Sequence, residues 1–196
     1  MKQRTIKQPV TISGAGLHSG APATITFKPA PVNHGYKFQR IDLADRPVIN
    51  ADVNRVASTN RGTTIQSGSA EISTVEHALS ALYGLQLDNV LVEIDGPEVP
   101  ILDGSARGFV EALQKAGLVE QEAEREFFEV EAPISLYDEE TGTEMLALPA
   151  DHFEIITMID FNSPVLGQQY ASLRCLNDYA DAIAPCRTFV FLHELE

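Results

Sequence analysis

Over residues 1–120, the period-two hydrophobic pattern of strands is followed by the hydrophobic spacing of helices. This order constrains the fold more than any other feature. Residues 23–27 and 36–41 alternate apolar and polar side chains with period two, as half-buried strands do. Residues 5–13 are typical of an entry strand, and residues 89–94 form a further strand-like run. The pattern predicts a unit in which strands come first and helices follow.

Two helices are predicted within the same stretch. The first starts near Ser73 and ends at Gly84, because three apolar residues fall on one helical face: Val75, Leu79 and Leu82. The second runs from about Ser105 to Ala116 and has Gly117 as its C-terminal stop. Its inward face is predicted to consist of Phe109, Val110 and Leu113.

A charged run at residues 121–126 is typical of a solvated face or a linker, and we take it as a domain boundary. Beyond it the pattern indicates a hairpin, an apolar strand and a helix, at residues 134–148, 153–161 and 173–182. We expect that the chain ends inside an unfinished second unit. We therefore predict a first domain, a linker and a partial second domain, over residues 1–121, 122–127 and 128–196.

The charge balance excludes one class of partner. The chain has 28 acidic and 14 basic residues and a net charge of −14, whereas proteins that bind nucleic acid usually present a basic face. Hydrophobic residues make up 44% of the chain, so a sizeable core is possible. No apolar run approaches the length of a transmembrane segment, and the N-terminus lacks an apolar signal-peptide core. We therefore expect a soluble cytoplasmic protein.

Cysteines and histidines do not form a complete metal site in the sequence. Cys175 and Cys186 lack Cys-x-x-Cys spacing, and we expect both to be reduced, buried thiols. The five histidines are not paired at the spacing of a local site: His18, His34, His77, His152 and His193. His193-Glu194 is followed by only two residues, so a His-Glu-x-x-His motif cannot be completed. A catalytic zinc needs about three protein ligands.

The most informative segment is Ser73–His77. Ser73 and Glu76 have the spacing of a capping box, so Glu76 can be interpreted as a helix cap and His77 as a structural histidine. The same positions also suit catalysis. The positive end of the helix dipole favours the neutral, metal-binding form of a histidine in the first turn. Because adjacent helical residues point about 100° apart, one of the pair can bind a metal while the other faces a water.

Five segments, in this order along the chain, resemble the UDP-3-O-acyl-N-acetylglucosamine deacetylases of lipid A biosynthesis. They are Lys2–Lys7, Gly14–Gly20, Ser73–His77, Pro97–Ala106 and Cys186–Phe189. The resemblance covers the whole chain. It implies an enzyme of Gram-negative bacteria that hydrolyses the N-acetyl group of UDP-3-O-(3-hydroxyacyl)-N-acetylglucosamine, the committed step of lipid A synthesis, with one zinc held by two histidines and an aspartate.

The resemblance also implies roles for five residues. His77 would be the first zinc ligand, and Glu76 the general base that takes a proton from the attacking water. Thr188 would stabilise the oxyanion, although a hydroxyl bonded to backbone is the alternative. Leu17 and Phe189 would contact substrate, with core packing as the alternative for both.

The family fold implied is α+β, with two similar sheet-plus-helix domains, helices packed between the sheets and the active site at their interface. The second domain would be incomplete here. The other two zinc ligands belong to a His-x-x-x-Asp motif that has no counterpart before Glu196. We therefore expect a chain truncated before two zinc ligands, inactive alone. Residues 36–43 are similar to the subgroup fused to a 3-hydroxyacyl-carrier-protein dehydratase.

Two other hypotheses stay open at this point. The chain could be a non-catalytic binding module that keeps the first domain and holds a nucleotide-sugar or a partner, or an unrelated α+β protein with chance motifs. A reading frame that continues beyond codon 196 into His-x-x-x-Asp would favour the deacetylase over the binding module. The sequence does not indicate acyl-chain preference or oligomeric state.

Overall fold

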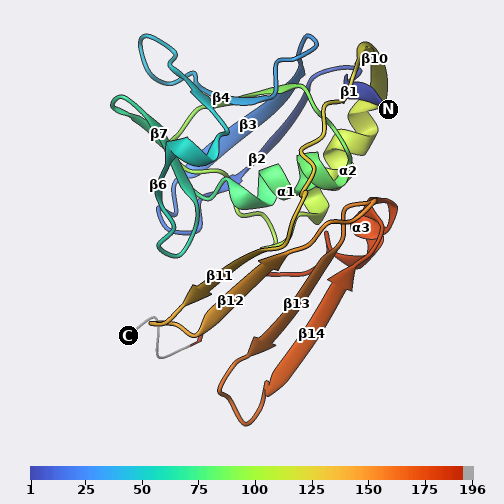
Figure 1. Cartoon of the computed structure of the whole chain (residues 1–196). Helices are drawn as coiled ribbons and strands as arrows, with labels where there is room; N and C mark the ends of the chain where they lie inside the picture. The colour runs from blue at the N-terminus through green and yellow to red at the C-terminus, as the bar shows by residue number, and fades with distance from the viewer. Residues whose placement is uncertain (192–196) are drawn as a thin grey trace. The chain divides into compact units, whose positions relative to one another are not determined.

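The computed structural model describes residues 1–191, which divide into two compact units (Figure 1). The first unit contains Met1–Glu124 together with the segment that starts at Asn177, and the second contains Arg125–Leu176. The domain limits given by the sequence pattern stay a prediction.

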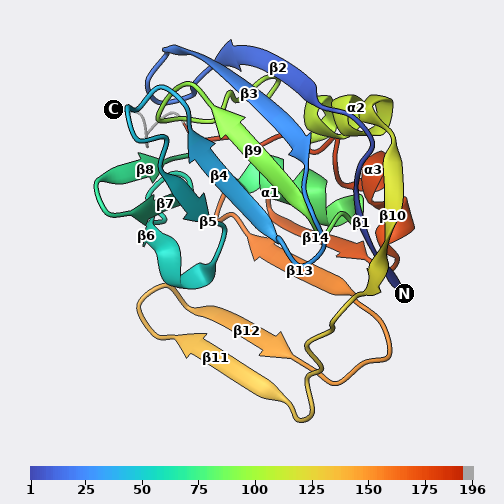
Figure 2. The ribbon, with the colours of Figure 1, turned by 90° about the horizontal axis from the view of Figure 1, so that it is seen from above.

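A five-stranded sheet forms the body of the first unit (Figure 2). Its strands lie in the order β2 (Val10–Ala15), β3 (Pro22–Pro29), β9 (Val90–Ile94), β4 (Tyr36–Arg40) and β5 (Val48–Asn50). Only β4 and β9 run parallel among these neighbours, and the other pairs are antiparallel. The strands predicted at residues 23–27, 36–41 and 89–94 are confirmed, because their alternate side chains are buried, as Ile25 and Phe27 are on β3.

Two helices cover one face of this sheet: α1 (Glu76–Gly84) and α2 (Arg107–Ala116) (Figure 2). The ring of Phe109 on α2 meets Phe27 on β3 edge to face, with ring centroids 6.2 Å apart. The predicted inward face of α2 is confirmed, since Phe109, Val110 and Leu113 are all buried. On α1, Leu82 is fully buried and Leu79 is half-buried.

The predicted ends of both helices are confirmed, but for different reasons. Gly117 follows α2 with φ +76°, a positive value that favours glycine. Gly84 is the last residue of α1. The residue with a positive φ at this end of the helix is Gln86, two positions later, with φ +56°. The start of α1 was predicted near Ser73 and lies at Glu76.

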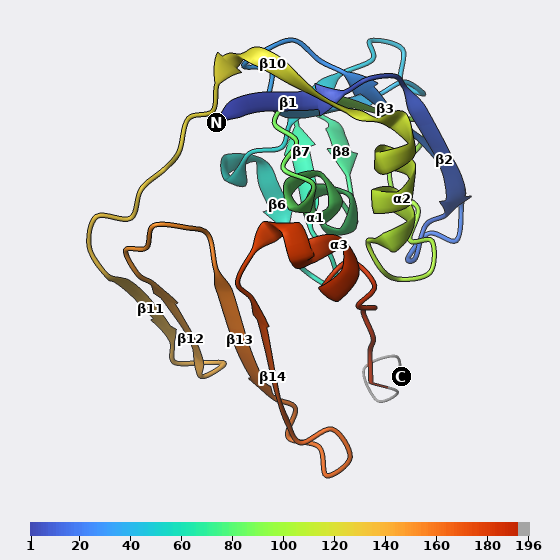
Figure 3. The ribbon, with the colours of Figure 1, turned by 90° about the vertical axis from the view of Figure 1, so that its right-hand side faces the viewer.

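Two smaller sheets complete the first unit. Strand β1 (Lys2–Ile6) pairs antiparallel with β10 (Leu118–Glu124), and Figure 3 shows them side by side. The charged run therefore begins inside a strand and not in a loop. The other sheet contains β6 (Val56–Ser58), β7 (Thr64–Ser67) and β8 (Ala70–Ile72), with a short 3-10 turn, η1 (Val53–Arg55), before it.

The second unit consists of two antiparallel hairpins. One pairs β11 (Ile134–Asp138) with β12 (Thr143–Ala147), and the other pairs β13 (Ile155–Asp160) with β14 (Gln168–Leu173). The predicted hairpin and the predicted apolar strand are thereby confirmed. The helix predicted over residues 173–182 is wrong for its first half, because Leu173 ends β14. A 3-10 turn, η2 (Leu176–Asp178), and the four-residue helix α3 (Tyr179–Ala182) follow.

The α+β fold class is confirmed by this mixture of sheets and helices. The expectation of two similar domains with helices between their sheets stays a prediction. Within residues 1–191, no helix is both long and apolar enough to cross a membrane. Cys175 and Cys186 are both free, as expected, but both are exposed, so the prediction of buried thiols is wrong.

Candidate active site

Glu76 and His77 form the first turn of α1, directly after the connection from β8. The predicted capping box is absent, because no side chain caps the helix and the Ser73 hydroxyl donates to the Pro97 carbonyl at 3.2 Å. The carboxylate of Glu76 instead accepts a hydrogen bond from the Thr63 amide at 2.9 Å. The interpretation of Glu76 as a helix cap is therefore wrong. Its side chain is directed at the turn before β7.

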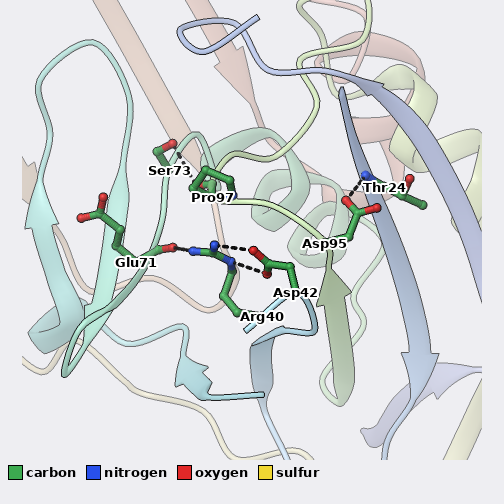
Figure 4. A network of polar contacts seen from close by, with 7 residues as sticks. All are labelled: Thr24, Arg40, Asp42, Glu71, Ser73, Asp95 and Pro97. Atoms are coloured by element: carbon green, nitrogen blue, oxygen red, sulfur yellow. Dashed lines mark hydrogen bonds and ion pairs between the residues drawn. The ribbon is translucent and has the colours of Figure 1, made fainter. Parts of the chain in front are cut away.

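A short parallel bridge joins two of the segments that carry the family resemblance. The Ser73 amide donates to the Pro97 carbonyl at 2.8 Å, and the Val99 amide donates to the Ser73 carbonyl at 3.1 Å. Figure 4 shows the Ser73 side chain beside Pro97. Pro97–Ala106 is thereby held against the entry to α1.

Glu98 lies between Pro97 and Val99. It connects Ser73–His77 and Pro97–Ala106 to the glycine-rich loop Gly14–Gly20. Its Oε1 accepts from the His18 amide at 2.8 Å and from the Thr74 hydroxyl at 3.2 Å, and its Oε2 accepts from the Ser19 amide at 2.8 Å. Burial by itself would raise the pKa of Glu98, but the hydrogen bonds from His18, Ser19 and Thr74 together hold that pKa below its ordinary value. The carboxylate is therefore ionised and satisfied inside the fold.

Thr74 has an unusual backbone conformation immediately before the Glu-His pair. Its φ is +59°, and only 1% of its surface is exposed. A left-handed conformation is disfavoured for a β-branched residue and persists where the surrounding structure enforces it. The hydrogen bond to Glu98 and the adjacent bridge at Ser73 are the contacts that enforce it here.

Gly62 marks the place where three polar side chains converge. A Cβ added to Gly62 would lie 3.4 Å from Glu76 Oε1, 3.6 Å from His18 Nε2 and 3.6 Å from Thr74 Oγ1. The His18 ring is also fixed by a 3.0 Å contact between its Nε2 and the Arg61 carbonyl. A carboxylate, an imidazole and a hydroxyl thus surround a backbone position that has no side chain, and an added Cβ there would be in van der Waals contact with all three.

Strand β8, which leads into this site, is attached to the main sheet by Arg40 (Figure 4). The Arg40 guanidinium forms two hydrogen bonds with Asp42, at 2.8 and 2.7 Å, and a third with the Glu71 carbonyl at 2.7 Å. The Arg40 side chain lowers the pKa of Asp42, as expected for a bidentate ion pair. The Arg40 guanidinium, oriented by Asp42, thus holds the Glu71 carbonyl, which lies two residues before Ser73.

Thr188 reaches the same unit through the chain that follows Asn177. Its amide donates to the Gly104 carbonyl at 2.9 Å, within the Pro97–Ala106 segment. Upstream, the Ala106 amide donates to the Ala184 carbonyl at 3.0 Å, and the Tyr179 hydroxyl lies 2.6 Å from Ser80 Oγ on α1. Cys186–Phe189 is therefore tied to Pro97–Ala106, and the chain leading to it is tied to α1 through Tyr179.

The two residues predicted to contact substrate are both on the surface. Leu17 is 50% exposed in the glycine-rich loop, and Phe189 is 58% exposed and stacks edge to face on Phe191. Core packing, the alternative for both, does not hold for either. The segment Lys2–Lys7 lies elsewhere, in β1 beside β10 and the loop before β9, where the Arg4 carbonyl accepts from the amides of Asp88 and Asn89.

The donor set fits one zinc ligand and not a complete site. His77 is a half-buried imidazole at the start of α1, and imidazole nitrogen is a common zinc ligand. Among residues 1–191 no three His, Cys, Asp or Glu side chains are close enough together to hold a metal. His193 and Glu194 lie outside the described residues. Sequence reasoning gave no role to Glu98, although Pro97–Ala106 contains it, because the burial of a carboxylate cannot be seen in a sequence.

Comparisons with known proteins cover nearly the whole chain. Residues 3–196 match the family model described as UDP-3-O-acyl N-acetylglycosamine deacetylase. The chain is 42% identical over 196 residues to the bifunctional enzyme LpxC/FabZ of Bacteroides thetaiotaomicron, covering 100% of this chain and 42% of the relative. It is 45% identical over 195 residues to the protein of the same name from Porphyromonas gingivalis, covering 100% of this chain and again 42% of the relative.

A third relative carries the shorter name UDP-3-O-acyl-N-acetylglucosamine deacetylase and comes from Methylococcus capsulatus. The two sequences are 41% identical over 199 residues, which covers 100% of this chain and 65% of the relative. The chain thus spans less than two thirds of the length of these relatives.

Proposed function

This chain belongs to the UDP-3-O-acyl-N-acetylglucosamine deacetylase family, and we propose that it contributes catalytic and zinc-binding residues to removal of the N-acetyl group from UDP-3-O-(3-hydroxyacyl)-N-acetylglucosamine, the committed step of lipid A biosynthesis. The observation that carries the proposal is the placement of Glu76. Its carboxylate is held by the Thr63 amide beside the His18 ring, at a position that Gly62 leaves open.

Each named residue has a role in this reaction that its chemistry supports. His77 would be one protein ligand of the zinc. Zinc, when bound, lowers the pKa of a water and polarises the acetyl carbonyl. Glu76 takes a proton from the water whose oxygen adds to the carbonyl carbon, and returns a proton to the nitrogen as the C–N bond breaks. The products are acetate and the free amine.

Thr188, Leu17 and Phe189 would act on the substrate. The backbone amide of Thr188 donates to the Gly104 carbonyl, and its side-chain hydroxyl would donate to the oxygen on which negative charge develops. Leu17 and Phe189 offer exposed apolar surface suited to the acyl chain.

The test compares Glu76→Ala with unchanged protein, using the natural protein that contains this sequence. We expect the rate of acetate release to fall by about 10²-fold or more, the scale of a lost general base, with zinc content retained. Glu111→Ala, at an exposed position of α2, is the matched control and should leave the rate unchanged. Loss of zinc together with activity would contradict the role of base.

The non-catalytic alternative makes a different prediction for the same material. A binding module would bind the UDP-sugar without releasing acetate, and neither variant would change that. Acetate release that requires Glu76 would exclude it.

A further inference from the structure

Glu98 is a buried carboxylate that has no direct part in the proposed reaction. Only 3% of its surface is exposed, so it cannot contact a substrate without rearrangement. Its oxygens accept hydrogen bonds from His18, Ser19 and Thr74, which belong to two segments that are far apart in the chain. Burying a charged group is unfavourable unless hydrogen bonds compensate it, and here they do.

One route from Glu98 to the general base runs along the backbone. Thr74 lies two residues before Glu76, and its left-handed conformation, with φ +59°, sets the direction in which the chain enters α1. The Thr74 hydroxyl is bonded to Glu98 Oε1 at 3.2 Å. Because such a conformation is unfavourable for threonine, losing this contact should let the first turn of α1 relax.

A second route runs through the glycine-rich loop. Glu98 fixes the amide of His18, whose ring contacts the Arg61 carbonyl at 3.0 Å. The same turn continues through Gly62 to Thr63, whose amide donates to the Glu76 carboxylate at 2.9 Å. Both routes therefore end at the same side chain, one at its backbone and the other at its carboxylate.

Gly16 permits this arrangement. A Cβ at Gly16 would lie 2.2 Å from Glu98 Oε2 and 2.4 Å from Ser19 Oγ, so no larger residue fits while the carboxylate stays in place. The glycine-rich loop can approach Glu98 this closely because Gly16 has no side chain.

We propose that Glu98 is a positioning residue, which holds Thr74 and the glycine-rich loop so that the Glu76 carboxylate points at the position left open by Gly62. The inference rests on the proposed function, in which Glu76 is the general base. It does not give Glu98 a proton-transfer role, since only 3% of its surface is exposed.

The experiment uses the zinc-loaded natural protein that contains this sequence, with Glu98→Gln compared against Asn89→Ala. Asn89 is the matched control because it is also buried, at 1% exposure, and hydrogen bonded, but to Gln3, Gln121 and Gly35, away from both routes. For each variant one measures kcat, KM, zinc content, Tm and amide hydrogen exchange in residues 16–20 and 62–64.

For Glu98→Gln we expect kcat to fall by about 10²-fold while KM changes by less than about threefold, because misplacing a catalytic group affects the transition state more than binding. Zinc content should be unchanged and exchange faster in both segments. Asn89→Ala should lower Tm and leave kcat within about twofold. The proposal is overturned if Glu98→Gln keeps wild-type kcat, or if Asn89→Ala loses as much kcat for the same loss of Tm.

Amide exchange and a second pair of variants cover two other outcomes. If the unchanged protein releases no acetate, the proposed function fails, and amide exchange still tests the role of Glu98. Faster exchange of Glu98→Gln in both segments supports the positioning role, and unchanged exchange overturns it.

If Glu98→Gln does not fold, Thr74→Val removes only one of the three donors to Glu98. Thr74→Ser retains the hydroxyl, and its kcat should exceed that of Thr74→Val by about tenfold. Equal kcat values for these two variants would overturn the proposal.

Discussion

Tyr179 occupies the space that Gly84 leaves on α1. A Cβ added to Gly84 would lie 2.1 Å from Tyr179 Cδ1 and 2.3 Å from Cε1, and Tyr179 is only 4% exposed. Its hydroxyl lies 2.6 Å from Ser80 Oγ, one turn earlier on the same helix. The Tyr179 ring therefore packs directly on Gly84, the last residue of α1. This contact positions the chain segment that leads to Thr188, so Gly84 has a role beyond ending the helix.

Gly84→Ala should destabilise the first unit by about 1–3 kcal/mol, the usual cost of overpacking a filled site. The better helix propensity of alanine, at most about 1 kcal/mol, would offset only part of this. Denaturant unfolding measures the change. Gly108→Ala on α2 is the control, because its added Cβ meets only the flexible end of Leu102, at 2.8 Å. Adding Tyr179→Ala to Gly84→Ala should remove the extra cost of the alanine, and strict additivity of the two would contradict the contact.

Thr188→Val should lower kcat more than it weakens substrate binding. Valine keeps the shape and the backbone hydrogen bond to the Gly104 carbonyl but removes the hydroxyl donor. A lost donor to a developing oxyanion costs about 10²–10³-fold in kcat. Steady-state kinetics of the natural protein give both parameters. Thr26→Val, which removes a hydroxyl on β3 that is bonded to Thr11, should leave kcat unchanged. An unchanged kcat in Thr188→Val would reduce Thr188 to a structural role.

The pH dependence of stability should reveal the buried Glu98 carboxylate. The pKa of Glu98 is lowered in the folded protein from an ordinary value of 4.5. The folded state therefore binds the proton less readily than the unfolded state does, so the contribution of Glu98 to stability is present above pH 4.5 and is lost as pH falls through the lowered folded pKa.

Glu98→Gln should accordingly be less stable than the unchanged protein near neutral pH, with the difference shrinking as the pH is lowered. Unfolding free energies measured from about pH 7 to about pH 3 test this, with Glu111→Gln as a control at an exposed position. A difference that stays constant over the whole range would mean that ionisation of Glu98 does not contribute to stability.

Periodicity predicted the elements that have one buried face. Strands β3, β4 and β9 and helix α2 follow directly from alternating or helical burial, and the glycine at position 117 marked the end of α2. The three- and four-residue strands β5 to β8 were not predicted, because so few residues carry no period. The helix expected at residues 173–182 is wrong over its first half because Leu173 belongs to β14, and the helix that forms in the second half is only four residues long.

Roles for single residues of the candidate site came only from the family resemblance, and they stay predictions. Glu76 and His77 lie at a helix start as expected, but the position of Glu76 depends on Thr63, Gly62 and His18, which are distant in sequence. The capping box, a local interpretation, was wrong because Ser73 is paired with Pro97. Long-range hydrogen bonds of this kind have no local sequence signal.

Arg40→Lys tests whether the ion pair with Asp42 matters for the site as well as for stability. Arg40 is 7% exposed, and its planar guanidinium binds both Asp42 oxygens and the Glu71 carbonyl at once. A lysine ammonium keeps the charge but cannot reproduce this fork, so two or more hydrogen bonds are weakened or lost. At about 0.5–1.5 kcal/mol for each net hydrogen bond, the first unit should lose about 1–3 kcal/mol of stability.

Because the Glu71 carbonyl lies two residues before Ser73, Arg40→Lys should also speed amide exchange at Ile72 and Ser73 and lower kcat of the natural protein modestly, by about two- to tenfold. Lys28→Met, which breaks the 2.7 Å surface pair with Glu93 on the same sheet, is the control for a lost charge pair, and it should change stability by less than about 1 kcal/mol. Unchanged exchange at Ile72 and Ser73 in Arg40→Lys would mean that β8 keeps its position without the guanidinium, and that Arg40 contributes only to the stability of the sheet.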